Sequence, residues 1–313
     1  MMRSPLLRVA VALLALTGAG VLHWADSAVP VPAAAQAPAG GAAARETLRL
    51  AEQRVSAQAY AGGLASALAP VLAGDAAFLL EGVPIVQGRD AIERLLRAQA
   101  ALQGLQASWS PFRVLLSGDG SLGVTFGETM LQRTAEPPAR GRYITVWRRS
   151  AADRWEIVAQ AYTGLLSAGQ VVLPAAAAGS GAGGAPMPNA FTQADLAFAR
   201  LAADSGAPTA FGRYIAPDGM TLASTGELNI GPATARARLA EGRAGAAAWK
   251  WHPVLAFVAA SGDLGATIGE AEIRLGSGQQ SETFYSKYLT VWQRQPDGSL
   301  KFVVDGGSAR PRP

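Results

Sequence analysis

The chain has 313 residues, of which 50% are hydrophobic and 16% are charged, so it is long enough for two globular domains. Its formal net charge is only +4 and its lysines and arginines form no basic run, which argues against a nucleic-acid partner. The sequence contains no cysteine, which excludes disulfides and thiol chemistry.

The N-terminal segment has the layout of a secretory signal. Arg3 and Arg8 precede an apolar run at residues 9–16, and small residues follow it. We therefore expect residues 1–28 to be a cleaved signal peptide and the mature protein to be periplasmic or secreted. The apolar run is shorter than the ~20 residues that span a membrane, so we expect no stable membrane insertion after cleavage.

A long internal repeat is the most informative feature of the remaining chain. Residues 141–158 read GRYITVWRRSAADRWEIV, and residues 286–303 read SKYLTVWQRQPDGSLKFV. A shift of 142–145 positions superposes further identical residues of the two halves: Asp75 on Asp218, Gly88 on Gly231, Trp109 on Trp251, Pro111 on Pro253, and Leu122, Gly123, Thr125, Gly127 and Glu128 on Leu264, Gly265, Thr267, Gly269 and Glu270. The period is that of a whole small domain, so each copy should have its own hydrophobic core.

The domain boundaries follow from composition. We place the first copy at residues 45–165 and the second at 191–308. The segments 29–44 and 166–190 are uncharged and rich in proline, alanine and glycine, which is typical of a flexible spacer and an interdomain linker. Residues 309–313 are left as a C-terminal tail.

In each copy, helical patterns come first and strand patterns follow. In the second copy the pattern predicts helices at 192–204, 208–215 and 233–244, strands at 249–260, 264–275, 284–294 and 300–305, and a short strand with a loop within 218–230. Thr192 is the expected N-cap of the first helix. Turn residues such as those at 261–263 join consecutive strands into antiparallel hairpins. The fold class is therefore α+β, with helices before an antiparallel meander.

The penultimate strand of each copy has two different faces. One face carries aromatic and hydroxyl side chains: Tyr143, Thr145 and Trp147 in the first copy, and Tyr288, Thr290 and Trp292 in the second. The opposite face is aliphatic: Ile144, Val146, Leu289 and Val291. We expect the first face to line a cavity under the helices and the aliphatic faces to pack on each other as an intramolecular pseudo-dimer.

Helices followed by a meander with the patterns W-x-P, SGDLG-x-T-x-G, KYLTVW and PDGS-L-K-F-V-V-D resemble the SnoaL-like, ketosteroid-isomerase-like branch of the nuclear transport factor 2 superfamily. The resemblance implies two cone-shaped domains, each with N-terminal helices packed on a curved antiparallel sheet around an apolar cavity. Enzymes and binding modules share this fold, so it does not settle function. The first copy has Gln160 and Ser110 where the second has Asp305 and His252. If one cone is functional, we therefore expect it to be the second.

Three side chains of the second copy are candidates for proton transfer: Asp305, Glu270 and His252. Each also has a structural explanation. Asp305 can serve a turn or salt bridge, Glu270 and its counterpart Glu128 can lie on a strand that has reached solvent, and His252 can be a half-exposed residue at the start of a strand. Because His252 is the only histidine outside the expected signal, we predict no catalytic triad, no metal site and no cofactor.

Seven aromatic or hydroxyl residues are candidates for ligand binding: Tyr288, Thr290, Trp292 and Trp251 in the second copy, and Tyr143, Thr145 and Trp147 in the first. The Tyr288 hydroxyl can donate to a ligand oxygen, although a core tyrosine with one satisfied hydrogen bond explains it equally well. The sequence thus predicts an exported tandem protein that binds a small, mostly apolar molecule, mainly in the second domain. The alternatives are an isomerase, dehydratase or cyclase that uses carboxylate-mediated proton transfer, and a structural or partner-binding module with filled cavities.

Overall fold

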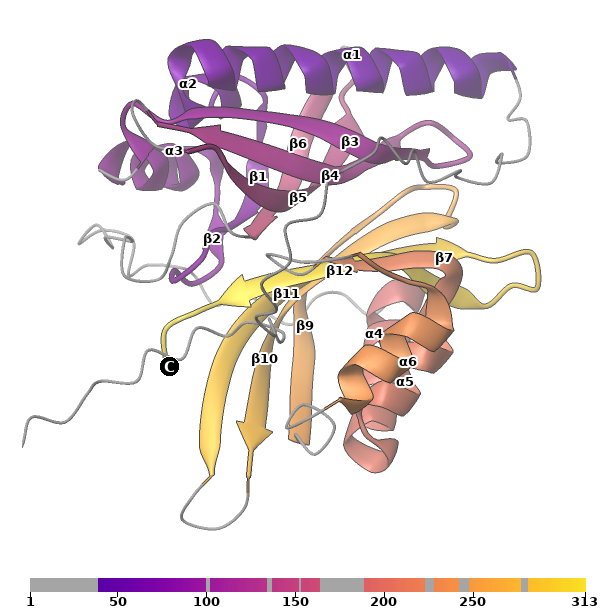
Figure 1. Cartoon of the computed structure of the whole chain (residues 1–313). Coiled ribbons are helices and arrows are strands. Elements are labelled where there is room, and N and C mark those ends of the chain that lie inside the picture. Colours follow the sequence, from indigo (N-terminus) through magenta and orange to yellow (C-terminus); the bar gives the residue numbers. More distant parts are fainter. Residues whose placement is uncertain are drawn as a thin grey trace, which may run out of the picture.

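The computed structural model describes most of the chain: residues 39–99, 102–133, 137–151, 153–163, 189–222, 228–241, 248–276 and 281–313. These residues form two six-stranded mixed sheets with helices packed on each (Figure 1). The expected signal peptide, residues 1–28, lies outside the described residues, as does nearly all of the expected linker. Within the described segments, none of the helices combines the length and apolar character that crossing a membrane requires.

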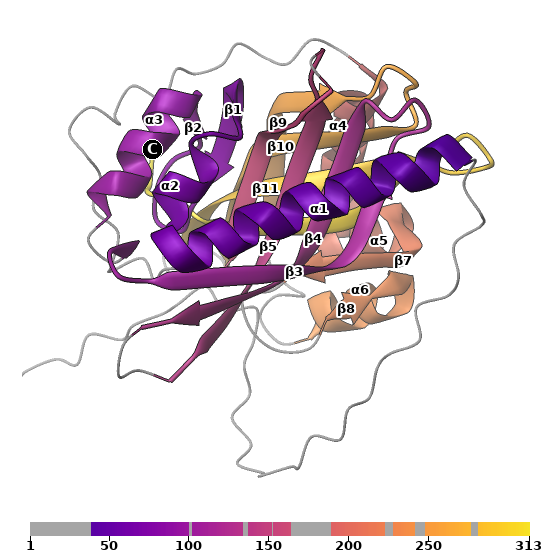
Figure 2. The ribbon, with the colours of Figure 1, turned by 90° about the horizontal axis from the view of Figure 1, so that it is seen from above.

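The first domain contains α1 (Ala39–Gly62), α2 (Leu64–Leu68), β1 (Leu72–Leu79), β2 (Val86–Gln87), α3 (Arg89–Ala98), β3 (Gln106–Leu116), β4 (Leu122–Gln132), β5 (Ala139–Arg149) and β6 (Trp155–Thr163). Its strand order is β2-β1-β6-β5-β4-β3, and β1 and β6 are parallel while the other neighbours are antiparallel. The long helix α1 crosses the outer face of this sheet (Figure 2). A buried helix face and a buried strand face therefore enclose the first core.

The second domain contains α4 (Ala190–Ser205), α5 (Ala207–Tyr214), β7 (Ile215–Leu222), β8 (Asn229–Ile230), α6 (Gly231–Ala240), β9 (Ala248–Val258), β10 (Leu264–Leu275), β11 (Glu282–Arg294) and β12 (Leu300–Ala309). The strand order β8-β7-β12-β11-β10-β9 repeats that of the first domain, again with one parallel pair, β7 and β12. The helices α4, α5 and α6 lie on the face of the sheet that is turned away from the first domain (Figure 1).

Local sequence explains the helix start and the hairpin turns. The Asn189 side chain accepts hydrogen bonds from the backbone N–H groups of Phe191 and Thr192, and the Thr192 hydroxyl accepts one from the Asn189 N–H, so the two form a capping box. Asn189, rather than the expected Thr192, is thus the N-cap. In the β9–β10 turn Gly262 has a φ of 66°, which glycine adopts without a steric penalty.

The two sheets pack face to face through their aliphatic sides. Ile144 and Val146 of β5 and Leu289 and Val291 of β11 are all buried in one hydrophobic core that both domains share. Polar contacts frame this core at two turns: the Gly118 N–H donates to Asp263 at 2.8 Å, and the Ser261 N–H donates to Asp119 at 2.9 Å. Arg113 adds an ion pair with Asp218 at 2.8 Å. The interface therefore combines an apolar centre with a polar rim.

Three details differ from the sequence-based expectation. Helix α1 begins at Ala39, so residues 39–44 of the expected spacer are helical. Strand β12 continues to Ala309, the first residue of the expected tail, whose carbonyl accepts a hydrogen bond from the Gly82 N–H at 2.9 Å. The antiparallel meander is joined by one parallel pair in each sheet, because the first long strand of each copy pairs with the last. The α+β class and the two domains of helices on a curved sheet are confirmed.

Candidate functional site

A buried carboxyl group lies under the first helix of the second domain. Asp195 of α4 is 1% exposed, and its two oxygens accept hydrogen bonds from different strands. Trp251 Nε1 donates to Oδ1 at 2.8 Å, and the Tyr288 hydroxyl donates to Oδ2 at 3.1 Å. Burial raises the pKa of Asp195 to about 6 despite these hydrogen bonds, because a desolvated carboxylate is disfavoured.

A second carboxyl group, that of Asp305, belongs to β12 in the same cone. The Thr290 hydroxyl donates to Asp305 Oδ1 at 2.5 Å, and Oδ2 has no hydrogen-bond partner among the described residues. Burial raises the pKa of Asp305 to about 7, the hydrogen bond from Thr290 lowers it, and the charge of Asp195 raises it further. Part of the surface of residue Asp305 stays accessible.

Tyr288 connects the two carboxyl groups electrostatically. Burial raises its pKa well above the ordinary range, and the charges of Asp195 and Asp305 add to the effect. The charge of Asp195 also raises the pKa of Asp305, so ionisation of Asp195 makes ionisation of Asp305 less favourable. Near neutral pH the cluster can hold a carboxylic acid that donates a hydrogen bond, or a carboxylate that accepts a proton.

Aromatic rings fill the helix side of this cone. Phe198 of α4 contacts five rings, with centroid separations of 4.7 to 6.0 Å: Phe211, Tyr214, Trp251, Trp292 and Phe302. Trp292 is fully buried and its Nε1 donates to the Thr267 hydroxyl at 2.9 Å. Trp292, a predicted ligand contact, therefore packs into the core. What stays accessible is the polar end at Asp305.

The first domain carries a carboxyl group in the matching place. Glu52 of α1 is 0% exposed, and its Oε2 accepts hydrogen bonds from Thr125 Oγ1 at 2.5 Å and Trp147 Nε1 at 3.1 Å. Burial raises its pKa to about 7. Tyr143 and Trp109 act on Glu52 as nearby donors, but the Tyr143 hydroxyl, Trp109 Nε1 and Glu52 Oε1 are all outside hydrogen-bond geometry and have no partner among the described residues. The polar groups of the first cone are thus less well satisfied than those of the second.

Thr145 of the first domain has a different partner from its counterpart Thr290. Gln160 Nε2 donates to Thr145 Oγ1 at 3.2 Å and to the Tyr162 hydroxyl at 3.0 Å. The Gln160 Oε1 atom is buried without a partner. The amide of Gln160 cannot titrate, so the first cone has one ionisable carboxyl group where the second has two.

Of the other predicted catalytic residues, Glu270 lies away from this cluster, whereas the charge of His252 lowers the pKa of Asp195. Glu270 is on the sheet face that continues the aliphatic side, where it forms an ion pair with Arg310 at 3.2 Å. Its counterpart Glu128 pairs with Arg140 and Arg142. His252 is exposed on β9 and lies opposite Glu270 in the strand register. Of the three candidates, Asp305 alone lies among the predicted ligand-binding residues Tyr288 and Thr290.

The two helix carboxyls, Glu52 and Asp195, were not among the residues predicted from the sequence. A signal was nevertheless present, since the offset of 143 that superposes Asp75 on Asp218 also superposes Glu52 on Asp195. A carboxylate on a helix usually faces solvent, so its repetition at one place in both copies was the informative observation.

Comparisons with known proteins find solved structures of low similarity. No protein-family model and no curated protein matches the chain. Among solved structures, an NTF2-like protein with a cystatin-like fold from Novosphingobium aromaticivorans is 18% identical, with a TM-score of 0.33, and covers 38% of this chain and 79% of its own. A domain of unknown function with a cystatin-like fold from Nostoc punctiforme is 13% identical, with a TM-score of 0.35 and coverages of 39% and 76%.

A third similar structure is an NTF2-like protein of unknown function from Pseudomonas putida, at 12% identity, a TM-score of 0.34 and coverages of 42% and 94%. At these identities no activity is carried over to this chain. In the structure itself, both halves of the chain have helices packed on a curved sheet with one shared strand order, which is the predicted fold of the superfamily that the sequence motifs resemble.

Proposed function

We propose that the second domain binds a small, mostly apolar molecule through one polar group, which meets Asp305 and Tyr288. The observation that carries the proposal is the environment of the Asp305 carboxyl group. The residue is partly accessible, one oxygen of its carboxyl group has no partner among the described residues, and it lies on the same strand as Phe302 of the aromatic core. A ligand with an apolar body and one hydroxyl or carbonyl group would satisfy that oxygen.

Protonation supports the choice of a neutral polar group. Because the pKa of Asp305 is raised to about 7, its carboxyl is partly protonated at neutral pH and can donate to a carbonyl or accept from a hydroxyl. An anionic ligand group would meet the charge of Asp195 as well, which makes it the less favourable occupant.

A second candidate function is proton transfer within the same cone. Its support is the pair of carboxyl groups with pKa values of about 6 and 7, a range suited to general acid–base catalysis at neutral pH. In an isomerase, dehydratase or cyclase of this kind Asp305 would move the proton, and Tyr288 would polarise a carbonyl group once its hydroxyl turns from Asp195 to donate to the ligand.

A screen of apolar ketones by thermal shift, followed by titration calorimetry, tests the binding proposal. Tyr288→Phe should weaken a ligand about fivefold, the equivalent of about 1 kcal/mol for one hydrogen bond, and Asp305→Asn should remove the pH dependence of binding near neutrality. Tyr143→Phe, the matched change in the first domain, should leave binding unchanged. Equal losses from Tyr143→Phe and Tyr288→Phe would contradict a site in the second domain.

The same ligands separate a binding protein from an enzyme. If Asp305 moves protons, the wild-type protein should exchange the α-hydrogens of a bound ketone for deuterium, which proton NMR detects, and Asp305→Asn should not. Ligand binding without deuterium exchange would support the binding function and contradict proton transfer.

Export and domain pairing are parts of the proposal with separate tests. The signal-like residues 1–28 support a periplasmic or secreted mature protein, and N-terminal sequencing from the native host would check the cleavage near Ala28. The shared core supports an intramolecular pseudo-dimer in solution, for which small-angle scattering should give one compact particle.

A further inference from the structure

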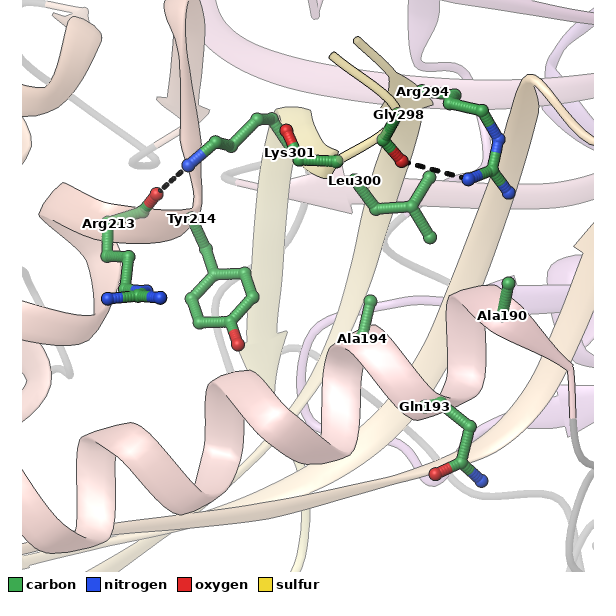
Figure 3. A pocket seen from close by; sticks show the side chains of 10 residues that line it. Ala190, Gln193, Ala194, Arg213, Tyr214, Arg294, Gly298, Leu300 and Lys301 are labelled. Atoms are coloured by element: carbon green, nitrogen blue, oxygen red, sulfur yellow. Dashed lines mark hydrogen bonds between the residues drawn. The ribbon is translucent and has the colours of Figure 1, made fainter.

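A groove of about 450 Å³ lies on the outer side of the second domain, away from Asp305. It is bounded by the first turn of α4, the end of α5 and the β11–β12 hairpin (Figure 3). Leu300, Ala190 and Tyr214 supply apolar surface, and Figure 3 shows the cations Arg213 and Lys301 on one side of Leu300 and Arg294 on the other. The volume is within the range of small-molecule sites.

The lining of the groove differs from the matching part of the first domain at one pair of positions. In the first domain Trp155 occupies the place of Leu300, since Trp155 pairs with Arg149 in the strand register as Leu300 pairs with Arg294. Trp155 is 8% exposed, and its Nε1 donates to the hydroxyl of Thr47 on α1 at 3.0 Å.

The helix register fixes the second member of the pair. Leu48 and Phe191 contact the matching glycines Gly123 and Gly265, so the preceding residues Thr47 and Ala190 correspond. The second domain thus has alanine and leucine where the first has a hydrogen-bonded threonine and tryptophan. The smaller side chains leave open the space that the Trp155 indole fills in the first domain.

The charges around the groove have one sign. Three cations line it, and no aspartate or glutamate does so among the described residues. Lys301 stands where the first domain has Glu156, so the charge at this place is reversed between the copies. Asp297 in the hairpin turn, which is fully exposed, interacts electrostatically with Lys301.

The cations retain donors for a ligand. Arg213 is exposed and has no hydrogen-bond or ion-pair partner among the described side chains. Lys301 donates to the backbone carbonyl of Arg213 at 2.5 Å, and Arg294 donates to the carbonyls of Gly262 and Gly298. These bonds to neutral carbonyls fix the side chains without neutralising them, and each cation has further N–H groups.

We propose that this groove binds a small organic anion, with its acid group at Arg213 and Lys301 and its apolar body on Leu300 and Tyr214. Three cations without a lining carboxylate favour an anionic group, and the apolar surface between them favours a hydrocarbon or aromatic body over a free inorganic ion. The site is separate from the cone at Asp305, and neither depends on the other.

Titration calorimetry on the full chain with benzoate, phenyl phosphate and neutral benzamide tests the proposal. At low salt one or both anions should bind at least tenfold more tightly than benzamide, and added salt should weaken them. Tighter benzoate would identify a carboxylate site, and tighter phenyl phosphate a phosphate site. If neither anion binds, or if benzamide binds as well as they do, the proposal is overturned.

Two variants locate the site. Arg213→Gln should weaken the anion about tenfold, while Arg54→Gln, which removes the same charge from an exposed position on α1, should leave the affinity unchanged. Leu300→Trp, which copies the first domain, should abolish binding in protein whose circular dichroism is that of the wild type. An unchanged affinity in Arg213→Gln, or an equal loss in Arg54→Gln, would place the anion elsewhere, whether or not Leu300→Trp folds.

Discussion

Glu52 and Asp195 occupy the same place on the first helix of the two domains, yet their carboxyl groups bond to side chains at non-equivalent positions of the two sheets. Glu52 reaches Thr125 and Trp147 through one oxygen and leaves the other without a partner. Asp195, one methylene shorter, bonds to Trp251 and Tyr288 through both oxygens. The two similar cones thus differ in the length of the helix carboxyl side chain and in the hydrogen bonds that this side chain accepts.

The raised pKa of Glu52 predicts that acid stabilises the first domain. Its pKa is 4.5 in the unfolded chain and about 7 in the folded protein, so the folded state binds the proton more tightly. The stabilising contribution is complete below about pH 4.5 and is lost as the pH rises through about 7, a change of about 3 kcal/mol. Glu52→Gln should remove this pH dependence. The free energy of unfolding of the variant, relative to that of the wild type, should therefore be larger at pH 8 than at pH 5.

Urea unfolding of both proteins across this pH range provides the measurement. Glu46→Gln is the control, because Glu46 is fully exposed on the same helix and its pKa is lowered by the hydrogen bond from Arg49. Parallel pH profiles for wild type and Glu52→Gln would show that Glu52 ionises as readily in the folded protein as in the unfolded chain.

Lys287 predicts a coupling across the domain interface. It is 0% exposed on β11, its ammonium group donates to the Ala309 carbonyl at 2.8 Å, and burial lowers its pKa to about 7. Glu81 of the first domain supplies the opposing charge. Removing one partner leaves the other as a buried group without its opposing charge. Lys287→Met and Glu81→Gln should therefore each lower the free energy of unfolding by about 1–3 kcal/mol, and the double variant should lower it by less than the sum. Additive losses in a double-mutant cycle would mean that the two groups do not interact.

Much of the fold could be predicted from sequence because the informative patterns were local. The alternation of Tyr288, Thr290 and Trp292 with Leu289 and Val291 assigned both faces of a strand, since alternation depends only on the backbone. Positions that depend on long-range pairing could not be obtained in this way. The parallel pairing of β7 with β12, and the burial of Asp195, are decided by which segments meet in the folded chain.

The groove illustrates the same limit. The repeat already aligned Trp155 with Leu300 and Glu156 with Lys301, so the differences were visible in the sequence. Their consequence depends on Ala190 of α4, which is remote in sequence and faces Leu300 only in the folded domain.

The shared core predicts that the two sheets separate when a charge is introduced between them. Val291 is 0% exposed on the interface side of β11. Val291→Asp should destabilise the protein by at least about 3 kcal/mol and enlarge its radius of gyration in small-angle scattering, since an unpaired buried carboxylate is strongly disfavoured. Val258→Asp, at a position 38% exposed, should do neither. Unchanged scattering and stability in Val291→Asp would show that this interface does not form in solution.

The aromatic cluster predicts how tightly the second cone is filled. Phe198 is 2% exposed and contacts five rings, so Phe198→Ala should cost about 3–5 kcal/mol of unfolding free energy and leave an apolar cavity. Such a cavity stays dry and accepts apolar molecules, so benzene should stabilise the variant in a thermal-shift assay and not the wild type.

Phe112→Ala is the control for the cavity, because Phe112 is 38% exposed and the guanidinium group of Arg142 lies over its ring, 5.5 Å from the centroid. It should cost less than about 1 kcal/mol and confer no benzene response. A loss in Phe198→Ala no larger than in Phe112→Ala would mean that the rings around Phe198 are loosely packed in solution. The cone would then be open along its apolar side as well as at Asp305, and a ligand would not need to stop at the polar end.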